Sequence, residues 1–206
     1  MAQRTKLLKF SQVKEMSNVF ESPESFKLKG PFLLELACGK GHYTVALAKE
    51  TPNLTHIGVD LKADRIWYGA TQAAEEGINN AFFIRSDIRK IQDYIPNNSV
   101  EEIWITFPGP FPRKKHAKHR LTHVNFLKIY KEILKPSGII HLKTDDSALF
   151  EFTQEQIQEI GGTIVDLEPD IYNQGYKDPR LEIKTQFEAK WLNRGKSINH
   201  LSFKLS

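Results

Sequence analysis

The stretch FLLELACGKGHYTVALAKE, which runs from Phe32 to Glu50, changes its periodicity at two glycines. Its first part, FLLEL, is an apolar run broken by a single acid and predicts a buried strand. Its last part repeats apolar residues at helical spacing and predicts a helix over Tyr43–Glu50. Gly39 and Gly41 lie between the two, where they permit either an ordinary tight turn or close approach of the backbone and the helix N–H groups to a ligand. The glycines alone leave both interpretations open.

The same alternation of strand and helix patterns continues along the chain. Short apolar runs rich in β-branched residues predict strands at 32–36, 55–60, 81–85, 100–106, 138–144, 163–167 and 198–204. Helical spacing recurs at 63–76, 122–134 and 147–160. This alternation predicts a Rossmann-like α/β fold, with a mostly parallel seven-stranded sheet and helices on both faces. We expect the ligand site beyond the C-terminal ends of the strands.

Length and composition indicate one domain. The chain has 206 residues, and its polar first part, 1–31, is interrupted by Pro23, Gly30 and Pro31, so we expect an N-terminal arm before a domain over 32–206. No apolar run approaches the roughly 18 residues that span a bilayer, and the N-terminal sequence lacks the pattern of a secretory signal. Cys38 is the single cysteine, which excludes an internal disulfide. A cytoplasmic protein is expected, without a membrane partner.

Acids lie at the ends of the first three expected strands, at Glu35, Asp60 and Asp87. Asp60 follows the glycine turn by about 20 residues, where an acid can accept hydrogen bonds from a ribose, and Asp87 is suited to an adenine amino group. Asp60 could instead cap the helix that follows. Glu35 would repel a pyrophosphate but suits a ligand with a cationic amino-acid end. The set therefore favours S-adenosylmethionine over a dinucleotide as the cofactor.

The stretch FPGPFPRKKHAKHRL, from Phe107 to Leu121, follows the fourth strand and concentrates positive charge in a chain whose net charge is only +4. Its prolines stiffen the loop, and its cations are suited to the phosphates of a folded RNA. Such a run is often only solvated surface, but its position beside the expected ligand site favours RNA. The predicted RNA-binding residues are Lys114, Lys115, Lys118 and Arg120. Histidines His42, His116, His119 and His123 lack metal-ligand spacing, so no metal is expected.

Several motifs together resemble the bacterial tRNA (guanine-N7-)-methyltransferase family, and the similarity covers nearly the whole chain. They are LLELACGKGHYTVALA, IGVDLKADRIW, EEIWITFPGPFPRKKHAKHRL, GIIHLKTDD and IKTQFEAKWL. The resemblance implies a class I methyltransferase that uses S-adenosylmethionine to methylate N7 of a guanine in the tRNA variable loop, at position 46. It implies tRNA as the partner, and a monomer or homodimer. By resemblance, the cofactor-binding residues are Glu35, Gly39, Gly41, Asp60 and Asp87, and the substrate-binding residues are Arg113, Asp145, Thr185 and Glu188.

Asp145 and Glu188 are the candidates for recognition of guanine, because a carboxylate offers two acceptors to the N1–H and the exocyclic amine. Asp145 and its neighbour could instead cap the helix that follows. The pattern Thr185-x-x-Glu188 is also that of a capping box, with Phe187 and Trp191 on one helix face. Both roles can coexist. The tryptophans are expected in the core rather than as stacking platforms.

One position departs from the family pattern. The family has F-P-D-P after the fourth strand, whereas this chain has F-P-G-P, with Gly109 in place of the aspartate. Guanine N7 has a lone pair and no proton, so its methylation needs no general base and no catalytic residue is assigned. The departure leaves two alternatives open: an RNA-binding homologue with weakened or lost catalysis, and a class I methyltransferase that acts on another RNA.

Overall fold

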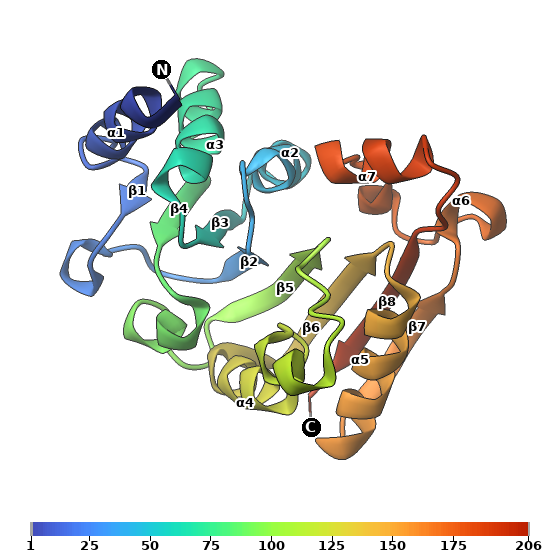
Figure 1. Cartoon of the computed structure of the whole chain (residues 1–206). Coiled ribbons are helices and arrows are strands. Elements are labelled where there is room, and N and C mark those ends of the chain that lie inside the picture. Colours follow the sequence, from blue (N-terminus) through green and yellow to red (C-terminus); the bar gives the residue numbers. More distant parts are fainter. Residues whose placement is uncertain (1, 206) are drawn as a thin grey trace.

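The computed structural model describes residues 2–205, with side chains for residues 7–185 and 187–205. The described residues form one eight-stranded sheet in the order β1-β4-β3-β2-β5-β6-β8-β7 (Figure 1). The strands are β1 Val19–Phe20, β2 Phe32–Leu36, β3 Thr55–Asp60, β4 Ala81–Arg85, β5 Val100–Thr106, β6 Leu134–Thr144, β7 Thr163–Glu168 and β8 Asn199–Lys204. Strands β1 to β6 pair in parallel, and β8 is antiparallel to both of its neighbours.

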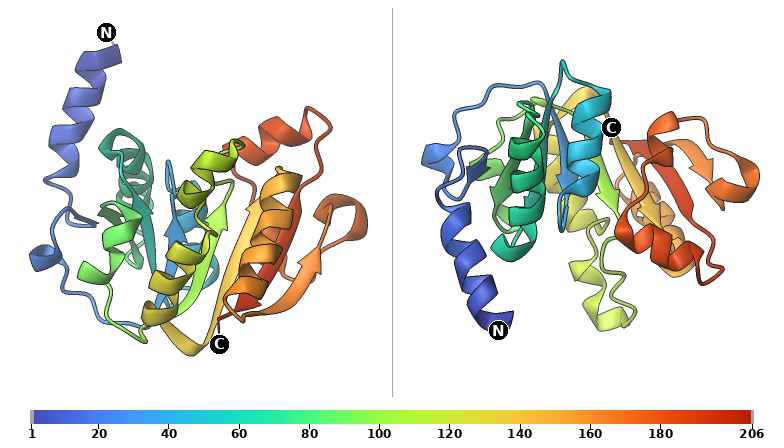
Figure 2. Two further views of the ribbon diagram at one scale, coloured as in Figure 1. Left: turned by 60° about the horizontal axis from the view of Figure 1, so that its bottom comes forward. Right: turned by 90° about the horizontal axis from the view of Figure 1, so that it is seen from above.

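Helices cover both faces of the sheet (Figure 2). They are α1 Ala2–Val13, α2 His42–Glu50, α3 Ala63–Glu75, α4 Val124–Ile133, α5 Ser147–Glu159, α6 Ile171–Gln174 and α7 Gln186–Leu192, with 3-10 turns η1 Pro23–Ser25, η2 Ile88–Asp93, η3 Lys114–His119 and η4 Pro179–Glu182. Alternate residues of β2 point to opposite faces, so Leu34 packs with Phe126 of α4 while Leu33 packs with Tyr43 and Leu47 of α2. The sheet therefore lies between two apolar layers.

The Rossmann-like α/β class predicted from the sequence is confirmed, and all seven predicted strands and four predicted helices are present. The sheet has one strand more than predicted, because the two residues of β1 pair with β4. Residues 1–31, predicted as an arm, thus contribute a strand, and α1 packs along α3. Strand β6 also begins earlier than predicted, at Leu134, directly after α4.

The order of the strands sets the position of the site. The connections after β2 run outward through β3 and β4, whereas those after β5 run outward through β6, so β2 and β5 meet where the strand order reverses. A crevice opens at the C-terminal strand ends of such a switch point.

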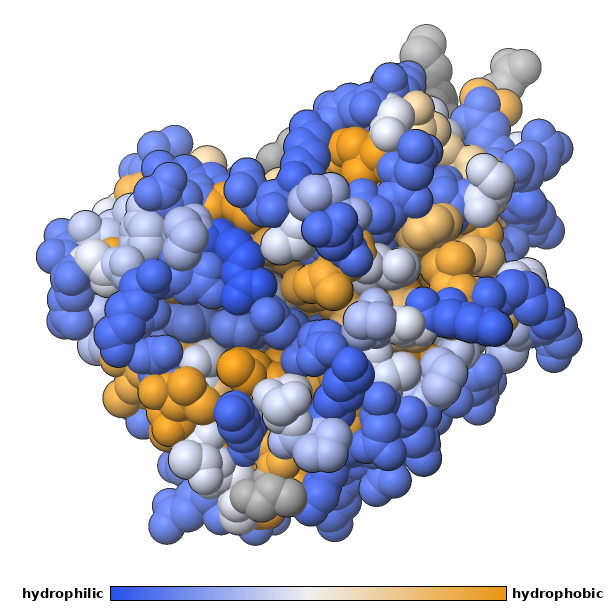
Figure 3. Space-filling model, turned by 180° about the vertical axis from the view of Figure 1, so that it is seen from behind, coloured by the Kyte–Doolittle hydropathy of each residue, from blue (hydrophilic) through white to orange (hydrophobic). Residues whose placement is uncertain are grey.

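The back of the molecule is mainly hydrophilic with separate apolar patches (Figure 3). Within residues 2–205, we find no helix with the length and apolar character needed to cross a membrane.

Candidate active site

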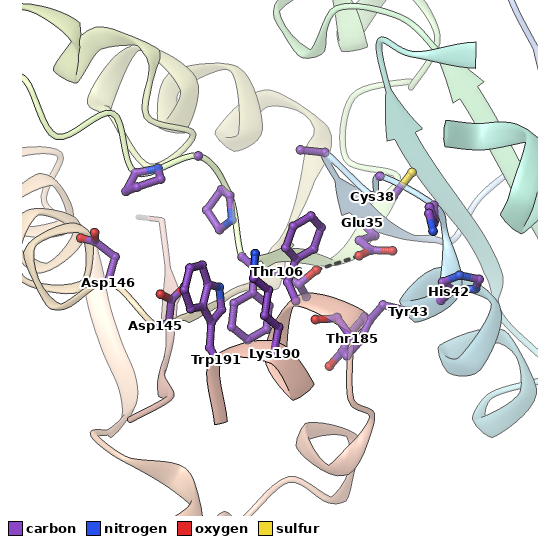
Figure 4. A pocket seen from close by; sticks show the side chains of 18 of the residues that line it. Glu35, Cys38, His42, Tyr43, Thr106, Asp145, Asp146, Thr185, Lys190 and Trp191 are labelled. Carbon is purple, nitrogen blue, oxygen red and sulfur yellow. Dashed lines mark hydrogen bonds between the residues drawn. The ribbon is translucent and has the colours of Figure 1, made fainter. Parts of the chain in front are cut away.

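A cavity of about 880 Å³ lies at the C-terminal ends of β2, β5 and β6, with α7 forming one wall (Figure 4). Its volume is within the range of cofactor and ligand sites. Glu35 and Asp145 lie on opposite sides of it (Figure 4). The residues discussed below that line it are Glu35, Gly39, Phe107, Gly109, Asp145, Asp146, Thr185, Trp191 and Lys196.

The two glycines after β2 have different roles. Both have a positive φ, +56° at Gly39 and +70° at Gly41. Gly39 lines the cavity, and no atom lies within 4 Å of the place where a Cβ would stand, so a ligand can approach its backbone. A Cβ on Gly41 would collide with the ring of Phe83 and come within 3.2 Å of the Gly69 Cα. Gly41, predicted to bind the cofactor, is not among the residues that line the cavity, although its two chain neighbours are, and it permits the close packing against Phe83 and Gly69.

Glu35 forms part of the cavity floor and is only 2% exposed. One carboxylate oxygen accepts hydrogen bonds from the backbone N–H of Thr44 at 2.8 Å and from the Thr44 hydroxyl. The other accepts a hydrogen bond from the Thr106 hydroxyl at 2.8 Å. Burial raises the pKa of Glu35 to about 7, although these hydrogen bonds oppose the shift. A cation bound in the cavity would therefore meet an acid that is easily driven to its charged form.

Asp60 and Asp87 both accept hydrogen bonds from backbone N–H groups of nearby turns, but only Asp87 caps a helix. Asp60 accepts hydrogen bonds from the backbone N–H of Gly39 at 3.0 Å and of Lys62 at 2.9 Å, which connects the turns after β2 and β3. Asp87 caps η2 by accepting from the N–H of Arg89, and it pairs with the Arg89 guanidinium, which lowers the pKa of Asp87. Neither carboxylate is among the residues that line the cavity, although Asp60 bonds to Gly39, which does line it.

The loop after β5 borders the cavity and depends on a buried arginine. Arg120 is 9% exposed; its Nε donates to the Pro110 carbonyl at 3.0 Å and its Nη2 to the Phe111 carbonyl at 3.2 Å. Its guanidinium also lies 4.3 Å from the ring centroid of Phe152. These contacts show that the guanidinium stabilises the loop from inside the fold, and the RNA-binding role of Arg120 stays a prediction.

The other cations of the loop are exposed. Lys114, Lys115 and Lys118 lie on η3, where solvent reaches their side chains, as a phosphate-binding surface requires. Arg113, predicted to contact guanosine, is also exposed and lies just before η3, outside the residues that line the cavity. Gly109 lines the cavity, and its φ is not in the left-handed region.

The two acids after β6 divide the roles that the sequence left open. Asp146 caps α5 by accepting from the N–H of Leu149 at 2.7 Å. Asp145 lines the cavity, and one of its oxygens lies 2.5 Å from the Nζ of Lys196. Both acids line the cavity, but one oxygen of Asp146 is engaged by the helix cap, whereas the contact printed for Asp145 is with the exposed Lys196 side chain.

The first turn of α7 has the capping box that the pattern predicts. The Glu188 N–H donates to Thr185 Oγ1 at 3.0 Å, and the Thr185 N–H donates to Glu188 Oε2 at 3.2 Å. Thr185 lines the cavity, but the side chain of Glu188, in the first turn of α7, is fully buried, where it pairs with Lys143 at 2.7 Å and accepts from the Tyr172 hydroxyl at 2.7 Å. The Glu188 carboxylate is already bonded within the fold, and its contact with guanine stays a prediction.

Two important residues were not identified from the sequence. Lys143 of β6 is fully buried, which lowers its pKa, and besides Glu188 its Nζ donates to the Leu181 carbonyl at 2.7 Å and the Ile183 carbonyl at 3.2 Å. It thereby joins α7 and η4 to the sheet. Trp191, expected in the core, is half-buried and lines the cavity. Its spacing from Phe187 would be the same on a buried helix face, so the sequence pattern could not distinguish the two positions.

No group of three or more histidine, cysteine or acidic side chains suited to a metal ion occurs among the residues that the structure describes. The sheet order, with β8 antiparallel between β6 and β7, and the cavity at the switch point agree with the fold of class I methyltransferases. Among solved structures, an antibiotic-related methyltransferase matches with a TM-score of 0.62 at 16% identity, over 96% of this chain and 94% of that one. A SAM dependent methyltransferase from Aquifex aeolicus matches with a TM-score of 0.58 at 16% identity, over 95% and 98% of the two chains.

Sequence comparisons identify the family. A family model described as a putative methyltransferase matches residues 29–201. The tRNA (guanine-N(7)-)-methyltransferase of Christiangramia forsetii is 39% identical over the full length of both chains. The protein of that name from Bacteroides thetaiotaomicron is 37% identical, over 98% of this chain and 86% of its own. The chain belongs to the tRNA (guanine-N7-)-methyltransferase family.

Proposed function

We propose that this protein transfers a methyl group from S-adenosylmethionine to N7 of a guanine in tRNA, and that the target lies in the variable loop, at position 46. The observation that carries the proposal is that one cavity has acids on two sides, Glu35 at the end of β2 and Asp145 after β6. The first suits a cationic methyl donor and the second the donor edge of guanine. The names of the curated relatives support the same reaction.

The residues on the β2 side fit the methyl donor. Open space at Gly39 admits a ligand against the backbone, and the buried Glu35 offers negative charge to the cationic parts of S-adenosylmethionine. Each oxygen of Asp60 accepts one backbone N–H and retains a second lone pair, so ribose hydroxyls can still donate to it. The donor supplies a methyl group on a positively charged sulfur, and the chain positions that group.

The residues on the α7 side fit guanine. Asp145 presents a carboxylate that can accept from N1–H and the exocyclic amine. Thr185 Oγ1 accepts the Glu188 N–H, so its own hydroxyl hydrogen can turn toward the cavity and donate to guanine O6. The N7 lone pair attacks the methyl carbon while the carbon–sulfur bond breaks, and no proton moves. The contribution of the chain to the rate is alignment and the negative charge of Asp145 near a guanine that becomes cationic.

The protein has a cationic surface beside the cavity that can bind the RNA around the target guanine. Lys114, Lys115 and Lys118 are exposed on η3, and the loop that leads to η3 lines the cavity at Phe107 and Gly109. Phosphates near the target nucleotide would therefore meet these lysines when the base is in the cavity.

The proposal is tested by incubating unmodified tRNA with the protein and S-adenosylmethionine and analysing the nucleosides by mass spectrometry. We expect 7-methylguanosine from the unmodified tRNA, and none when the guanine at position 46 is replaced by adenine. Product that persists in the substituted tRNA would contradict the position, and absence of 7-methylguanosine from every tRNA would contradict the activity.

A second candidate function rests on Gly109. This glycine lines the cavity where the family pattern has an aspartate, so the cavity lacks one carboxylate close to the reacting groups. A protein that binds tRNA through η3 without methylating it is the alternative. It predicts tRNA binding at physiological salt together with no 7-methylguanosine in the same experiment.

A further inference from the structure

The C-terminal end of α7 has a Schellman motif, which fixes the position of Lys196. Gly195 has a φ of +69° and its N–H donates to the Leu192 carbonyl at 2.9 Å, while the Lys196 N–H donates to the Trp191 carbonyl at 3.1 Å. In this motif the residue after the glycine packs back on the last turn of the helix. The stem of Lys196 is thereby directed over Trp191.

The ammonium of Lys196 contacts two groups of the cavity at once. Its Nζ lies 2.5 Å from an oxygen of Asp145 and 4.2 Å from the centroid of the Trp191 ring. In Figure 4, Asp145 and Trp191 are neighbours on the α7 side of the cavity. The Asp145 side chain is 13% exposed, whereas that of Lys196 is 44% exposed, so the lysine can swing into solvent while Asp145 stays in place.

A guanine base presents the same chemistry to these two residues. Its N1–H and exocyclic amine donate hydrogen bonds to a carboxylate, and its ring stacks on an indole, an interaction that single-stranded bases commonly make with aromatic side chains. Lys196 therefore occupies the carboxylate and covers the aromatic ring that the base requires. Lys196 and guanine therefore cannot bind the Asp145 carboxylate and the Trp191 ring at the same time.

We propose that Lys196 is an internal competitor of the target guanine, and that Trp191 is the platform on which the base stacks after Lys196 leaves. The proposal rests on guanine as the substrate. It also explains selectivity: adenine has an acceptor where guanine has N1–H, so adenine cannot replace an ammonium on Asp145. After transfer, the guanine is cationic, and the returning ammonium repels it while competing for Asp145.

The test is the substitution Lys196→Met, which retains an apolar stem over Trp191 but removes the charge. A pair with an exposed lysine contributes little, so loss of the competitor should lower the Kd for unmodified tRNA by about 1.5-fold to fivefold, with a parallel fall in KM. The slope of log affinity against log salt should stay unchanged. The matched control is Arg194→Met, because Arg194 lies 5.1 Å from the same indole and is exposed, yet it is outside the cavity lining. This control should produce no gain in affinity.

Other outcomes would overturn the proposal. If Lys196 binds a phosphate, Lys196→Met will weaken tRNA binding and reduce the salt slope by about 0.7–0.9 of a unit. An unchanged affinity would mean that the ion pair is only structural. The gain should also vanish when Asp145→Asn is present, and it should be absent with tRNA whose target guanine is replaced by adenine. A wild type that makes 7-methylguanosine while Lys196→Met shows no gain contradicts the competitor alone, whereas a wild type without product contradicts the proposed function.

Discussion

The two sides of the cavity are built in different ways. On the β2 side, Glu35 and Asp60 bond to the adjoining turns through contacts between positions 2 to 21 apart, and Glu35 has one further contact, with Thr106, 71 positions along the chain. On the α7 side, the wall is joined to the sheet by long-range contacts, chiefly those of Lys143 with Glu188, Leu181 and Ile183. The β2 side, which we assign to the methyl donor, is therefore stabilised by several independent contacts. The α7 side, which we assign to the substrate, depends on a few residues that single substitutions can remove.

The largest effect is expected from Lys143→Met. The substitution leaves the fully buried Glu188 carboxylate without its cation, and breaking such a pair costs about 3–5 kcal/mol. Urea unfolding followed by circular dichroism should show this loss of stability. Hydrogen exchange should show the fastest exchange in residues 179–192, and the β2 side should exchange as in the wild type.

Two variants sharpen this result. Adding Glu188→Gln to Lys143→Met removes the stranded charge and should restore part of the lost stability. Lys204→Met, at the exposed end of β8, is the matched control and should change stability by no more than about 0.5 kcal/mol. Equal exchange on both sides of the cavity in Lys143→Met would contradict the difference between them.

The next effect separates structural from RNA-binding cations in the loop after β5. Arg120→Ala removes two charge-assisted hydrogen bonds and a ring contact, and should lower stability by about 1.5–3 kcal/mol. Replacing Lys114, Lys115 and Lys118 by alanine should instead leave stability nearly unchanged. That triple variant should flatten the salt dependence of tRNA binding by about two units of slope.

Salt titrations of tRNA binding together with thermal unfolding of both variants make the comparison. A triple variant with the wild-type salt slope would mean that η3 is only a solvated surface. If Arg120→Ala kept the stability of the wild type but had a flatter salt dependence of tRNA binding, the RNA-binding role predicted for Arg120 would be supported.

What the sequence could predict follows the same division between the two sides. Strands β2 to β8 were recognisable because burial and periodicity are local properties, and the glycine turn and the position of Asp145 follow from strand ends. Strand β1 could not be recognised, because two residues have no periodicity and β1 exists only through its pairing with β4. The donor side is largely a local structure, so sequence patterns describe it well.

The burial of Arg120 and Lys143, which the sequence did not predict, depends on contacts outside any local pattern. Arg120 and Lys118 belong to one cationic run, but only Arg120 meets Phe152 of α5 and the carbonyls of its own loop. The burial of Lys143 requires Glu188, which lies 45 positions further along the chain. A lysine in a strand and a glutamate in a capping box have no sequence pattern that pairs them.

On the donor side, the pH dependence of Glu35 is the sharper probe. Because the pKa of Glu35 is raised to about 7, a cationic donor that needs its carboxylate should bind less tightly as the pH falls below 7, by up to about tenfold per pH unit. Titration calorimetry of S-adenosylmethionine across this range measures the change. Glu35→Gln should bind more weakly but with little pH dependence.

The stability of the unliganded protein should change in the opposite direction. A folded-state pKa above the ordinary 4.5 means that the contribution of Glu35 to stability is complete below pH 4.5 and is lost as the pH rises through about 7. Glu35→Gln, whose amide can donate to Thr106, should therefore be more stable than the wild type above pH 7. Parallel pH profiles of binding and stability would show that Glu35 does not titrate in this range.

The smallest effect concerns Gly109, where the two sides of the cavity meet. Gly109→Asp adds a carboxylate beside a guanine that becomes cationic, and should raise the single-turnover rate. The backbone admits the change, because Gly109 is outside the left-handed region; the nearest atoms to a Cβ there belong to the Phe111 ring, the closest at 3.2 Å, so this ring must shift slightly. One preorganised electrostatic contact is worth at most about 4 kcal/mol, and a carboxylate without supporting hydrogen bonds should supply much less, so we expect a gain in the single-turnover rate below about tenfold.

Gly109→Asn is the matched control, since it has the same shape without the charge and should leave the rate near that of the wild type. Equal rates for both variants would mean that the charge is too far from the guanine to act, and a decrease with both would mean that the ring of Phe111 cannot move.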